Sequence, residues 1–564
     1  MLSSSTWVPR GFAKEFPDKY ELDDEEMERI NQLAQLEIND AKEEIEELQN
    51  NGNASSDSPE EEEDDKPKTA KLGDQFEIDD DLKEYDLEHY DDDDEETQGS
   101  RVTMLPGLSN DAEFHEDEDG DEAYITLPNE EETVQDKQES QIYPTDNLIL
   151  STRTEDDVSF LDIHIYDDGA DDLLDPEVPE GHERPNALYV HHDLMLPAFP
   201  LAVEWINFKP NQPEGESDIG NFAAVGTFDP QIEIWNLDCM DKAFPDIILG
   251  EPSGAPSLKK KSKKTKKNKH ITTHHIDAVL SLSHNRSYRN ILASTSADTT
   301  VKLWDLNTAT AARSFNQIHS GKNVSSSQWH STEQAILLTG GYDSRVALTD
   351  VRIQDDSKTS KYWSINGDVE NVKWVNESQF LAGNDQGGVY CFDIRTLDKP
   401  IWTLQAHDAG ISSLDVNQYV PEMLATSAMG EKTVKLWKIP TYTEGEVLKN
   451  GPSMVMSRDF GVGNVLTTSF APDIEVAGNI VIGGVNKGLK MFDFFSNKAV
   501  RSNFKNELSK LQKQAREEAK EKGKQSRIAR KYDGNYTETM IQVDDVDGDV
   551  ESEDEGGDDD IDIA

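Results

Sequence analysis

The segment "LASTSADTTVKLWDL" (292–306) decides the fold, because related segments return five more times along the chain. The other copies span 222–237, 337–351, 380–394, 424–439 and 480–494. In each copy apolar residues alternate with other residues, as Val301 and Leu303 do around Lys302. Alternation with period two is typical of a β-strand, and a tight turn precedes it. The chain therefore repeats a small β unit.

The spacing of the copies identifies that unit. The marker residues at the strand ends are Trp235, Trp304, Thr349, Phe392, Trp437 and Phe492. They lie 69, 45, 43, 45 and 55 residues apart. Three of these spacings match the period of about 40–45 residues that is typical of a WD40 blade. The two longer spacings require insertions between blades.

A seventh unit completes the ring. In 147–168, Leu161, Ile163 and Ile165 alternate with Asp162, His164 and Tyr166. We therefore predict an all-β fold, a seven-bladed WD40 β-propeller over 146–495. We expect the first and last strands to share one blade, because closing the ring removes sheet edges. The sequence leaves the point of closure open.

A set of polar residues recurs with the blades. His275, His319 and His407 lie about 25 residues upstream of the repeated strand, and Asp298 and Asp343 lie on the turn before it. This is similar to the WD40 pattern, in which His, Ser or Thr, Asp and Trp form a buried hydrogen-bond network. In 275–304 the Ser is either Ser294 or Ser296. The predicted network residues are His275, Asp298, Trp304, His319, Asp343, His407, Trp437 and Trp235.

The network also resembles a hydrolase triad, but its recurrence from blade to blade favours a packing role. Not every blade has the full set. Thr349 replaces the Trp, and Gln386, Glu431 and Asn486 stand where the turn Asp is expected. We predict that these blades lack part of the network.

The charge of the chain concentrates outside the repeats. The 564 residues carry a net charge of −60, and only 35% of them are hydrophobic. We predict an acidic, largely disordered arm over 1–145, with one amphipathic helix near 22–49. A basic helix is predicted over 500–532 and an acidic disordered tail over 533–564. Ser58 and Ser552 precede acidic residues, so both are expected phosphorylation sites for acidophilic kinases.

Two basic segments interrupt this acidity. Residues 258–269 contain eight lysines within a predicted insertion at 251–270, and 503–532 contains ten Lys or Arg against four Glu. Neither segment interleaves aromatic residues, so a nucleic-acid contact would involve phosphates and would be sensitive to salt. A short lysine-rich run equally suits nuclear import. The residues assigned to import or RNA phosphate are Lys259, Lys260, Lys261, Lys263, Lys264, Lys266, Lys267, Lys269, Lys524, Arg527, Arg530 and Lys531.

Motifs of enzymes and metal sites are missing from the sequence. It has no GxxxxGK[ST], HExxH or GxSxG segment, so we expect no catalytic residue, cofactor or small-molecule substrate. The pair His191–His192 lacks a further spaced ligand, which favours a structural role over a metal site. Two cysteines, Cys239 and Cys391, suit a reducing compartment. No apolar run reaches the roughly 18 residues of a membrane span, and residues 1–16 contain no apolar h-region, so we expect neither a span nor a secretory signal.

Three segments resemble the periodic tryptophan protein 1 family: "TWVPRGFAKEFPDKYEL" (6–22), "LYVHHDLMLPAFPLAVEWINF" (188–208) and the blade at 274–306. The resemblance implies a non-catalytic nucleolar WD40 scaffold in ribosome biogenesis, acting in pre-rRNA processing and large (60S) subunit maturation. It implies pre-ribosomal particles, with their rRNA and assembly factors, as partners. The lysine-rich run 258–269 adds a nuclear import receptor as an expected partner. The acidic arms leave an alternative open, a chromatin-associated histone binder or chaperone that contacts basic proteins.

Overall fold

The computed structural model describes residues 1–20, 113–116, 123–126, 137–138, 140–169, 186–210, 218–250, 270–355, 358–396, 399–440, 450–486, 488–523, 526–532 and 540–543. The predicted helix near 22–49, the lysines of 258–269, Ser58, Ser552 and most of the predicted tail lie outside these residues. The chain divides into two units. One comprises Met1–Tyr20 with Lys137–Ala564, and the other comprises Glu21–Asp136. In the second unit, β3 (Glu113–Glu116) and β4 (Ala123–Thr126) form an antiparallel hairpin.

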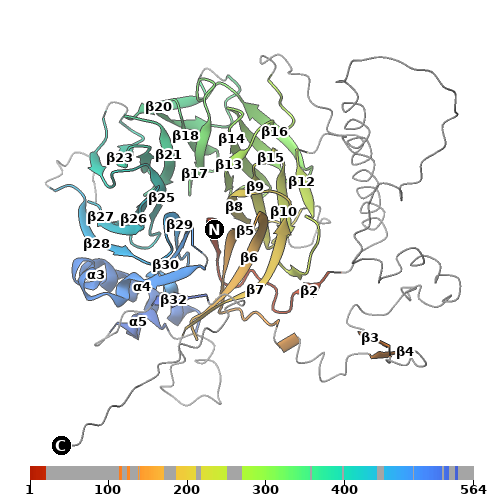
Figure 1. The fold of residues 1–564 in the computed structure, drawn as a ribbon. Helices are drawn as coiled ribbons and strands as arrows, with labels where there is room; N and C mark the ends of the chain where they lie inside the picture. Colours follow the sequence, from red (N-terminus) through yellow and green to blue (C-terminus); the bar gives the residue numbers. More distant parts are fainter. Residues whose placement is uncertain are drawn as a thin grey trace, which may run out of the picture. The chain divides into compact units, whose positions relative to one another are not determined.

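Seven four-stranded antiparallel sheets form a ring, which confirms the predicted seven-bladed propeller (Figure 1). Blade 1 consists of β1 (Leu2–Val8), β5 (Asn147–Glu155), β6 (Val158–Asp167) and β7 (Ala187–Leu196). Blade 2 consists of β8 (Pro200–Ile206), β9 (Phe222–Thr227), β10 (Ile232–Asn236) and β12 (Ile247–Leu249). Blade 3 consists of β13 (Val279–His284), β14 (Ile291–Ser296), β15 (Val301–Asp305) and β16 (Thr310–Phe315). Blade 4 consists of β17 (Val324–Trp329), β18 (Ile336–Gly341), β19 (Arg345–Asp350) and β20 (Ser360–Ser364).

The remaining blades follow the same order from the inner to the outer strand. Blade 5 consists of β21 (Val369–Trp374), β22 (Gln379–Asn384), β23 (Gly388–Asp393) and β24 (Trp402–Gln405). Blade 6 consists of β25 (Ile411–Val416), β26 (Met423–Ala428), β27 (Thr433–Lys438) and β28 (Ser453–Asp459). Blade 7 consists of β29 (Val465–Phe470), β30 (Asn479–Gly484), β31 (Lys490–Asp493) and β32 (Met540–Gln542).

The first residues of the chain close the ring. Strand β1 is the inner strand of blade 1 and pairs with β5, although residues 9–146 separate the two strands. Its side chains also reach blade 7, since Ser5 Oγ lies 2.9 Å from Thr467 Oγ1 and Trp7 Nε1 donates to the Ser469 carbonyl at 3.0 Å. The prediction that the disordered arm starts at residue 1 is therefore wrong, because Leu2–Val8 belong to blade 1. The expectation that the first and last strands share a blade is also wrong, because β32 belongs to blade 7.

Residues after β1 remain attached to the propeller. Phe12 packs edge-on against Trp205, with ring centroids 4.7 Å apart. Strand β2 (Asp18–Lys19) then pairs in parallel with β11 (Cys239–Met240). The family-like segment at 6–22 thus has a structural role as far as Tyr20.

Small residues let neighbouring blades approach closely. A Cβ placed on Gly340 would lie 2.5 Å from Val369 Cγ1 of blade 5, and one placed on Gly483 would lie 3.0 Å from Leu2 Cβ of blade 1. The second contact shows that β1 packs on blade 7 as the other inner strands pack on their preceding blades. Both faces of a blade are therefore covered. This explains why Asp162, beside the buried Leu161, is itself buried, contrary to a simple alternation of inward and outward residues.

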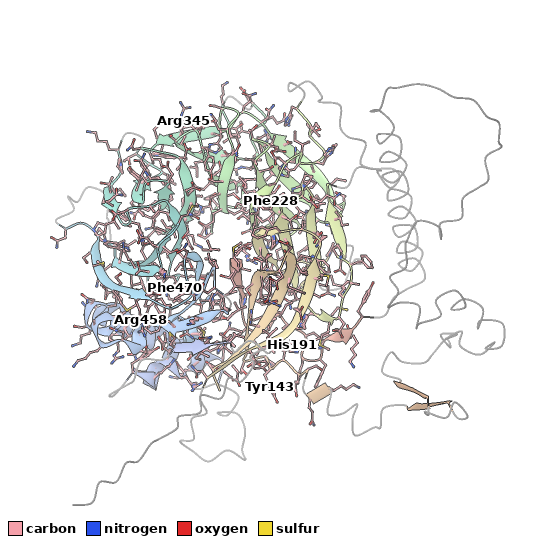
Figure 2. The ribbon with its side chains drawn as sticks, in the orientation of Figure 1. Tyr143, His191, Phe228, Arg345, Arg458 and Phe470 are labelled. Carbon is pink, nitrogen blue, oxygen red and sulfur yellow. The ribbon has the colours of Figure 1, made fainter. Side chains whose placement is uncertain are left out.

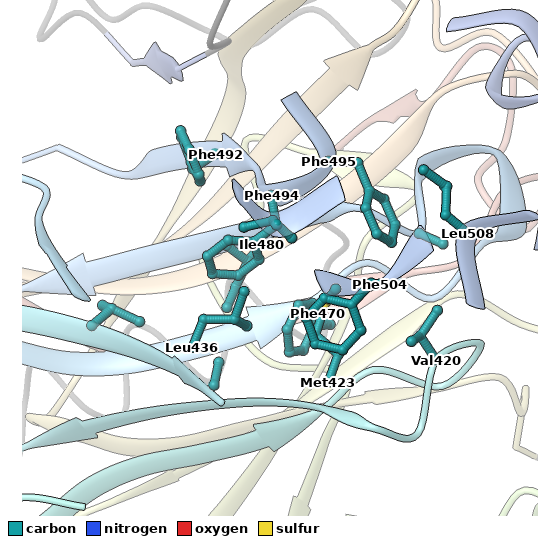
Figure 3. Packing of buried hydrophobic residues seen from close by; sticks show 14 of the residues in the cluster. Val420, Met423, Leu436, Phe470, Ile480, Phe492, Phe494, Phe495, Phe504 and Leu508 are labelled. Carbon is teal, nitrogen blue, oxygen red and sulfur yellow. The ribbon is translucent and has the colours of Figure 1, made fainter. Parts of the chain in front are cut away.

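Helices follow blade 7 before its outer strand. The segment after β31 forms η6 (Phe494–Ser496), α3 (Lys498–Asn503), α4 (Lys505–Glu521) and α5 (Ile528–Lys531), so the predicted single helix over 500–532 is broken. The predicted apolar positions Phe504, Leu508 and Leu511 are buried. They join a core cluster with Phe470 of β29 and Phe494 of η6 (Figure 3), to which Ile474 of η5 (Ile474–Val476) also belongs. Strand β32 also extends the propeller beyond the predicted boundary at residue 495.

Candidate functional surfaces

Blade 3 contains the complete predicted network. Trp304 Nε1 donates to Ser294 Oγ at 2.8 Å, and Ser294 Oγ lies 2.7 Å from His275 Nε2. His275 Nδ1 lies 2.9 Å from Asp298 Oδ2, so a neutral imidazole would donate from Nδ1 and accept at Nε2. Burial lowers the pKa of His275, which favours this neutral form. The open choice between Ser294 and Ser296 is settled, because Ser296 Oγ instead donates to the Asp277 carbonyl.

The carboxylate of this network is strongly stabilised. Burial alone would raise the pKa of Asp298, but hydrogen bonds from His275 and Thr300 outweigh it and lower the pKa to about 2. Asp298 Oδ2 also accepts the backbone N–H of Ile276 at 3.2 Å. The carboxylate therefore fastens the loop before blade 3 to the turn inside that blade.

Blade 6 has a complete network despite its substitution. Glu431 occupies the position of the turn Asp, and its Oε2 lies 2.7 Å from His407 Nδ1. Thr426 Oγ1 takes the place of the Ser, at 2.9 Å from His407 Nε2, and accepts from Trp437 Nε1 at 2.9 Å. The prediction that blade 6 loses part of the network is therefore wrong, because the longer Glu side chain still reaches the imidazole.

Blade 4 lacks one member, as predicted. His319 Nδ1 lies 2.9 Å from Asp343 Oδ1, and its Nε2 lies 2.9 Å from Thr339 Oγ1. Thr349 cannot supply the indole donor, and its hydroxyl instead lies 2.8 Å from Ser360 Oγ.

Trp235 in blade 2 has a different partner from the one the pattern suggests. Its Nε1 donates to Glu233 Oε2 at 3.2 Å, within the same strand. Burial raises the pKa of Glu233 to about 7. Trp235 is therefore buried, but it is not part of a His–Ser–Asp network.

These networks do not present a nucleophile to solvent. Ser294 and His275 are fully buried, and the hydroxyl also accepts from an indole. At the strand edge, His191 Nδ1 lies 2.7 Å from His192 Nδ1, and His191 Nε2 lies 3.1 Å from the Ser140 carbonyl. Burial lowers the pKa of both imidazoles. Within the described ranges, no group of three His, Cys, Asp or Glu residues is placed to hold a metal ion.

The inner strands of all seven blades line a cavity of about 460 Å³. Its walls are rich in Ser and Thr. Lys373 Nζ pairs with Asp415 Oδ1 at 2.7 Å, and this pairing outweighs burial and raises the pKa of Lys373. Asp415 Oδ2 also accepts the backbone N–H of Phe470 in the next blade at 2.7 Å. The polar groups named here therefore hold adjacent blades together.

The C-terminal basic residues divide into two groups. Lys531 Nζ pairs with the buried Asp493 at 3.0 Å, and this attraction outweighs burial and raises the pKa of Lys531. Arg527 Nη1 lies 4.0 Å from Asp168 Oδ1, and the Arg527 backbone N–H donates to Glu475 Oε2 at 2.9 Å. Lys531 and Arg527, both predicted contact residues, therefore make interactions within the folded chain. Lys524 and the side chain of Arg530 lie outside the described residues.

A second group of cations faces solvent on α4. The apolar stripe of this helix, including Leu508, Leu511 and Ala515, packs on the propeller (Figure 3). Its exposed residues include the cations Lys505, Lys510, Lys513, Arg516 and Lys520 and the anions Glu517 and Glu521. The amphipathic pattern predicted the stripe. The exposed cations of α4 precede the predicted contact residues Lys524, Arg527, Arg530 and Lys531 in the sequence. None of the described helices is long and apolar enough to cross a membrane.

Comparison with known proteins agrees with this architecture. The family model described as "WD domain, G-beta repeat" matches residues 266–305 and 398–438, which include the networks of blades 3 and 6. Periodic tryptophan protein 1 of Saccharomyces cerevisiae is 58% identical over 587 aligned residues, covering 100% of each chain. A WD repeat-containing protein of Schizosaccharomyces pombe is 37% identical, covering 90% of this chain and 92% of the relative.

A third relative comes from an animal. The periodic tryptophan protein 1 homolog of Drosophila melanogaster is 31% identical, covering 76% of this chain and 82% of the relative. The alignment with the yeast relative covers the segments of this chain that form β1, the blades and the helices α3 to α5. The chain belongs to the periodic tryptophan protein 1 family of WD40-repeat proteins.

Proposed function

We propose that this chain is a non-catalytic scaffold in ribosome biogenesis, acting in pre-rRNA processing and large (60S) subunit maturation in the nucleolus. The observation that carries the proposal is the row of exposed cations on α4, on a helix whose apolar stripe is anchored in the propeller. A fixed row of Lys and Arg without aromatic residues suits the phosphate backbone of a folded RNA. The buried His275–Ser294 pair and the His–Thr pairs of blades 4 and 6 are consistent with a role that does not involve catalysis.

Membership of the periodic tryptophan protein 1 family supports the ribosomal part of this proposal. The similarity to Periodic tryptophan protein 1 of Saccharomyces cerevisiae covers the whole length of the chain. The nucleolar role is what the family resemblance implies. In this proposal the propeller docks on a pre-ribosomal particle while α4 contacts rRNA phosphates. The lysine-rich segment 258–269 would engage an import receptor, RNA, or both in turn.

The proposal is tested by replacing the chain in cells with a charge variant of α4. The variant carries Lys510→Gln, Lys513→Gln and Lys520→Gln. A matched control removes three exposed cations from blade 4 and its flanking loops, with Lys322→Gln, Lys358→Gln and Lys361→Gln. We expect the α4 variant, but not the control, to accumulate unprocessed large-subunit precursor RNA and to leave the pre-60S fractions of a gradient.

Normal precursor levels in cells depleted of the chain would contradict the proposal. Recovery of the purified chain with core histones, rather than with pre-ribosomal particles, would favour the alternative of a histone binder. The charge variants and the purification use the full-length protein, so a folding defect in a variant is visible as loss of the chain itself.

A further inference from the structure

One face of the propeller carries exposed apolar side chains. The strands of each blade alternate in direction, so the loops between second and third strands lie on the same face as the connections from one blade to the next. We call this the loop face. On it, Phe228 is 60% exposed, Ile276 is 62% exposed and Val158 is 41% exposed (Figure 2 labels Phe228). Large apolar side chains on a soluble protein gather where another molecule binds.

These side chains follow one another on the loop face from blade 1 to blade 3. The rings of Phe199 and Phe228 lie 5.4 Å apart, and the Phe228 N–H donates to the Phe199 carbonyl at 3.0 Å. On one side, Ser159 pairs with Leu196, which brings Val158 next to Pro197.

On the other side the strip continues into blade 3. A Cβ placed on Gly226 would lie 2.8 Å from Val279 Cγ1. The two strands run in opposite directions, so Phe228, two residues beyond Gly226, is level with the residues just before Val279. Ile276 is among them. The apolar strip is thus formed by Val158, Pro197, Phe199, Phe228 and Ile276.

Acidic side chains border the apolar strip. Asp156 and Asp157 form the turn beside Val158, Asp229 follows Phe228, and Asp277 follows Ile276; all four are exposed. Such a border attracts cations and repels phosphates, so RNA is not the ligand that this surface fits. A second copy of this chain is also disfavoured, because its own apolar strip would carry the same negative border.

We propose that the apolar strip is a docking surface for a segment of another protein that combines Lys or Arg with aliphatic or aromatic side chains. The apolar residues would enter between the exposed rings, and the cations would meet the four carboxylates. The helix α4 belongs to the connection between the third and fourth strands of blade 7, which starts on the opposite face. The inference does not depend on the proposed function, since it concerns a protein partner and a different face.

The test is site-specific photo-crosslinking in cells with the full-length chain. A benzophenone amino acid replaces Phe228 or Ile276 in separate variants, and the control positions are the exposed Tyr362 and Met454. We expect crosslinks from the first two positions to a partner segment with an excess of Lys and Arg and at least one large apolar residue. Adding Asp229→Asn and Asp277→Asn should lower their yield by roughly tenfold.

Several outcomes would overturn the inference. These are a crosslink yield no higher than at the control positions, or crosslinks only to RNA, to a second copy, or to residues 251–269 of the same chain. A yield that is unchanged by the two Asn substitutions would also overturn it, because the carboxylates would then have no part in recognition. The labelled positions are exposed, so thermal melting of each variant should match that of the parent protein.

Discussion

Replacing Trp7 by Ala should destabilise the whole propeller, although Trp7 lies in the first eight residues of the chain. The side chain is only 5% exposed and packs edge-on against Tyr166, with ring centroids 6.3 Å apart. Its Nε1 donates to the Ser469 carbonyl of blade 7. Truncation of a buried Trp to Ala costs about 3–5 kcal/mol, which is a large part of the stability of an ordinary domain.

Urea unfolding followed by intrinsic fluorescence and by circular dichroism measures this loss as a shift of the midpoint. Trp7→Phe keeps most of the buried ring but leaves the Ser469 carbonyl without its donor, so we expect a smaller loss of about 1–2 kcal/mol. The matched control is Phe16→Ala, since Phe16 is 42% exposed and should change stability by about 0.5 kcal/mol or less. An unchanged midpoint for Trp7→Ala would refute the placement of β1 in the ring.

Other substitutions test the interior and α4. Glu431→Ala should lower the free energy of unfolding by about 1–3 kcal/mol, because His407 Nδ1 loses its acceptor, and Glu431→Asp should restore part of it; urea midpoints decide. The raised pKa of Glu233, about 7, means that its stabilising protonated form is lost as pH rises from about 4.5 to about 7. The stability advantage of Glu233→Gln over the parent should therefore grow across that range and then level off, and a flat difference would contradict it. Lys531→Gln should cost about 1–3 kcal/mol by unpairing the buried Asp493, yet leave the salt dependence of RNA binding unchanged. The triple α4 variant should instead reduce the slope of log affinity against log salt by about 2–3 in a filter-binding titration.

The repeats could be predicted because each blade carries its own local signals. The hairpin of β5 and β6, the strand β15 that contains Trp304, and the His275–Asp298 pair all lie within short segments, where alternation and turn residues are visible. The prediction for blade 6 was wrong because it considered only that Glu431 is not an Asp. It did not consider how far the Glu side chain extends. One additional methylene group lets a carboxylate meet the same imidazole.

Strand β1 could not be predicted, for two physical reasons. Its sequence, LSSSTWV, has little hydrophobic contrast, since its serines face the channel and neighbouring strands. Its partner β5 is also remote in the chain, so no turn signal joins them. Similarly, Lys531 looked like part of a solvent-exposed basic run, whereas its partner Asp493 lies in a strand 38 residues earlier. Ion pairs between distant segments leave no trace in local composition.

Because β1 lies far from β5 in the sequence, the propeller could be assembled from two separate pieces of the chain. The sequence between β1 and β5 includes the separate unit Glu21–Asp136, so cutting within that unit should leave the inner strand in the ring without a covalent link. A peptide of residues 1–20 should then behave as a ligand, and residues 137–564 as its receptor. In the intact chain the connection only raises the local concentration of the peptide. An open ring and a closed one would therefore differ by one reversible binding event, which a labelled peptide can report.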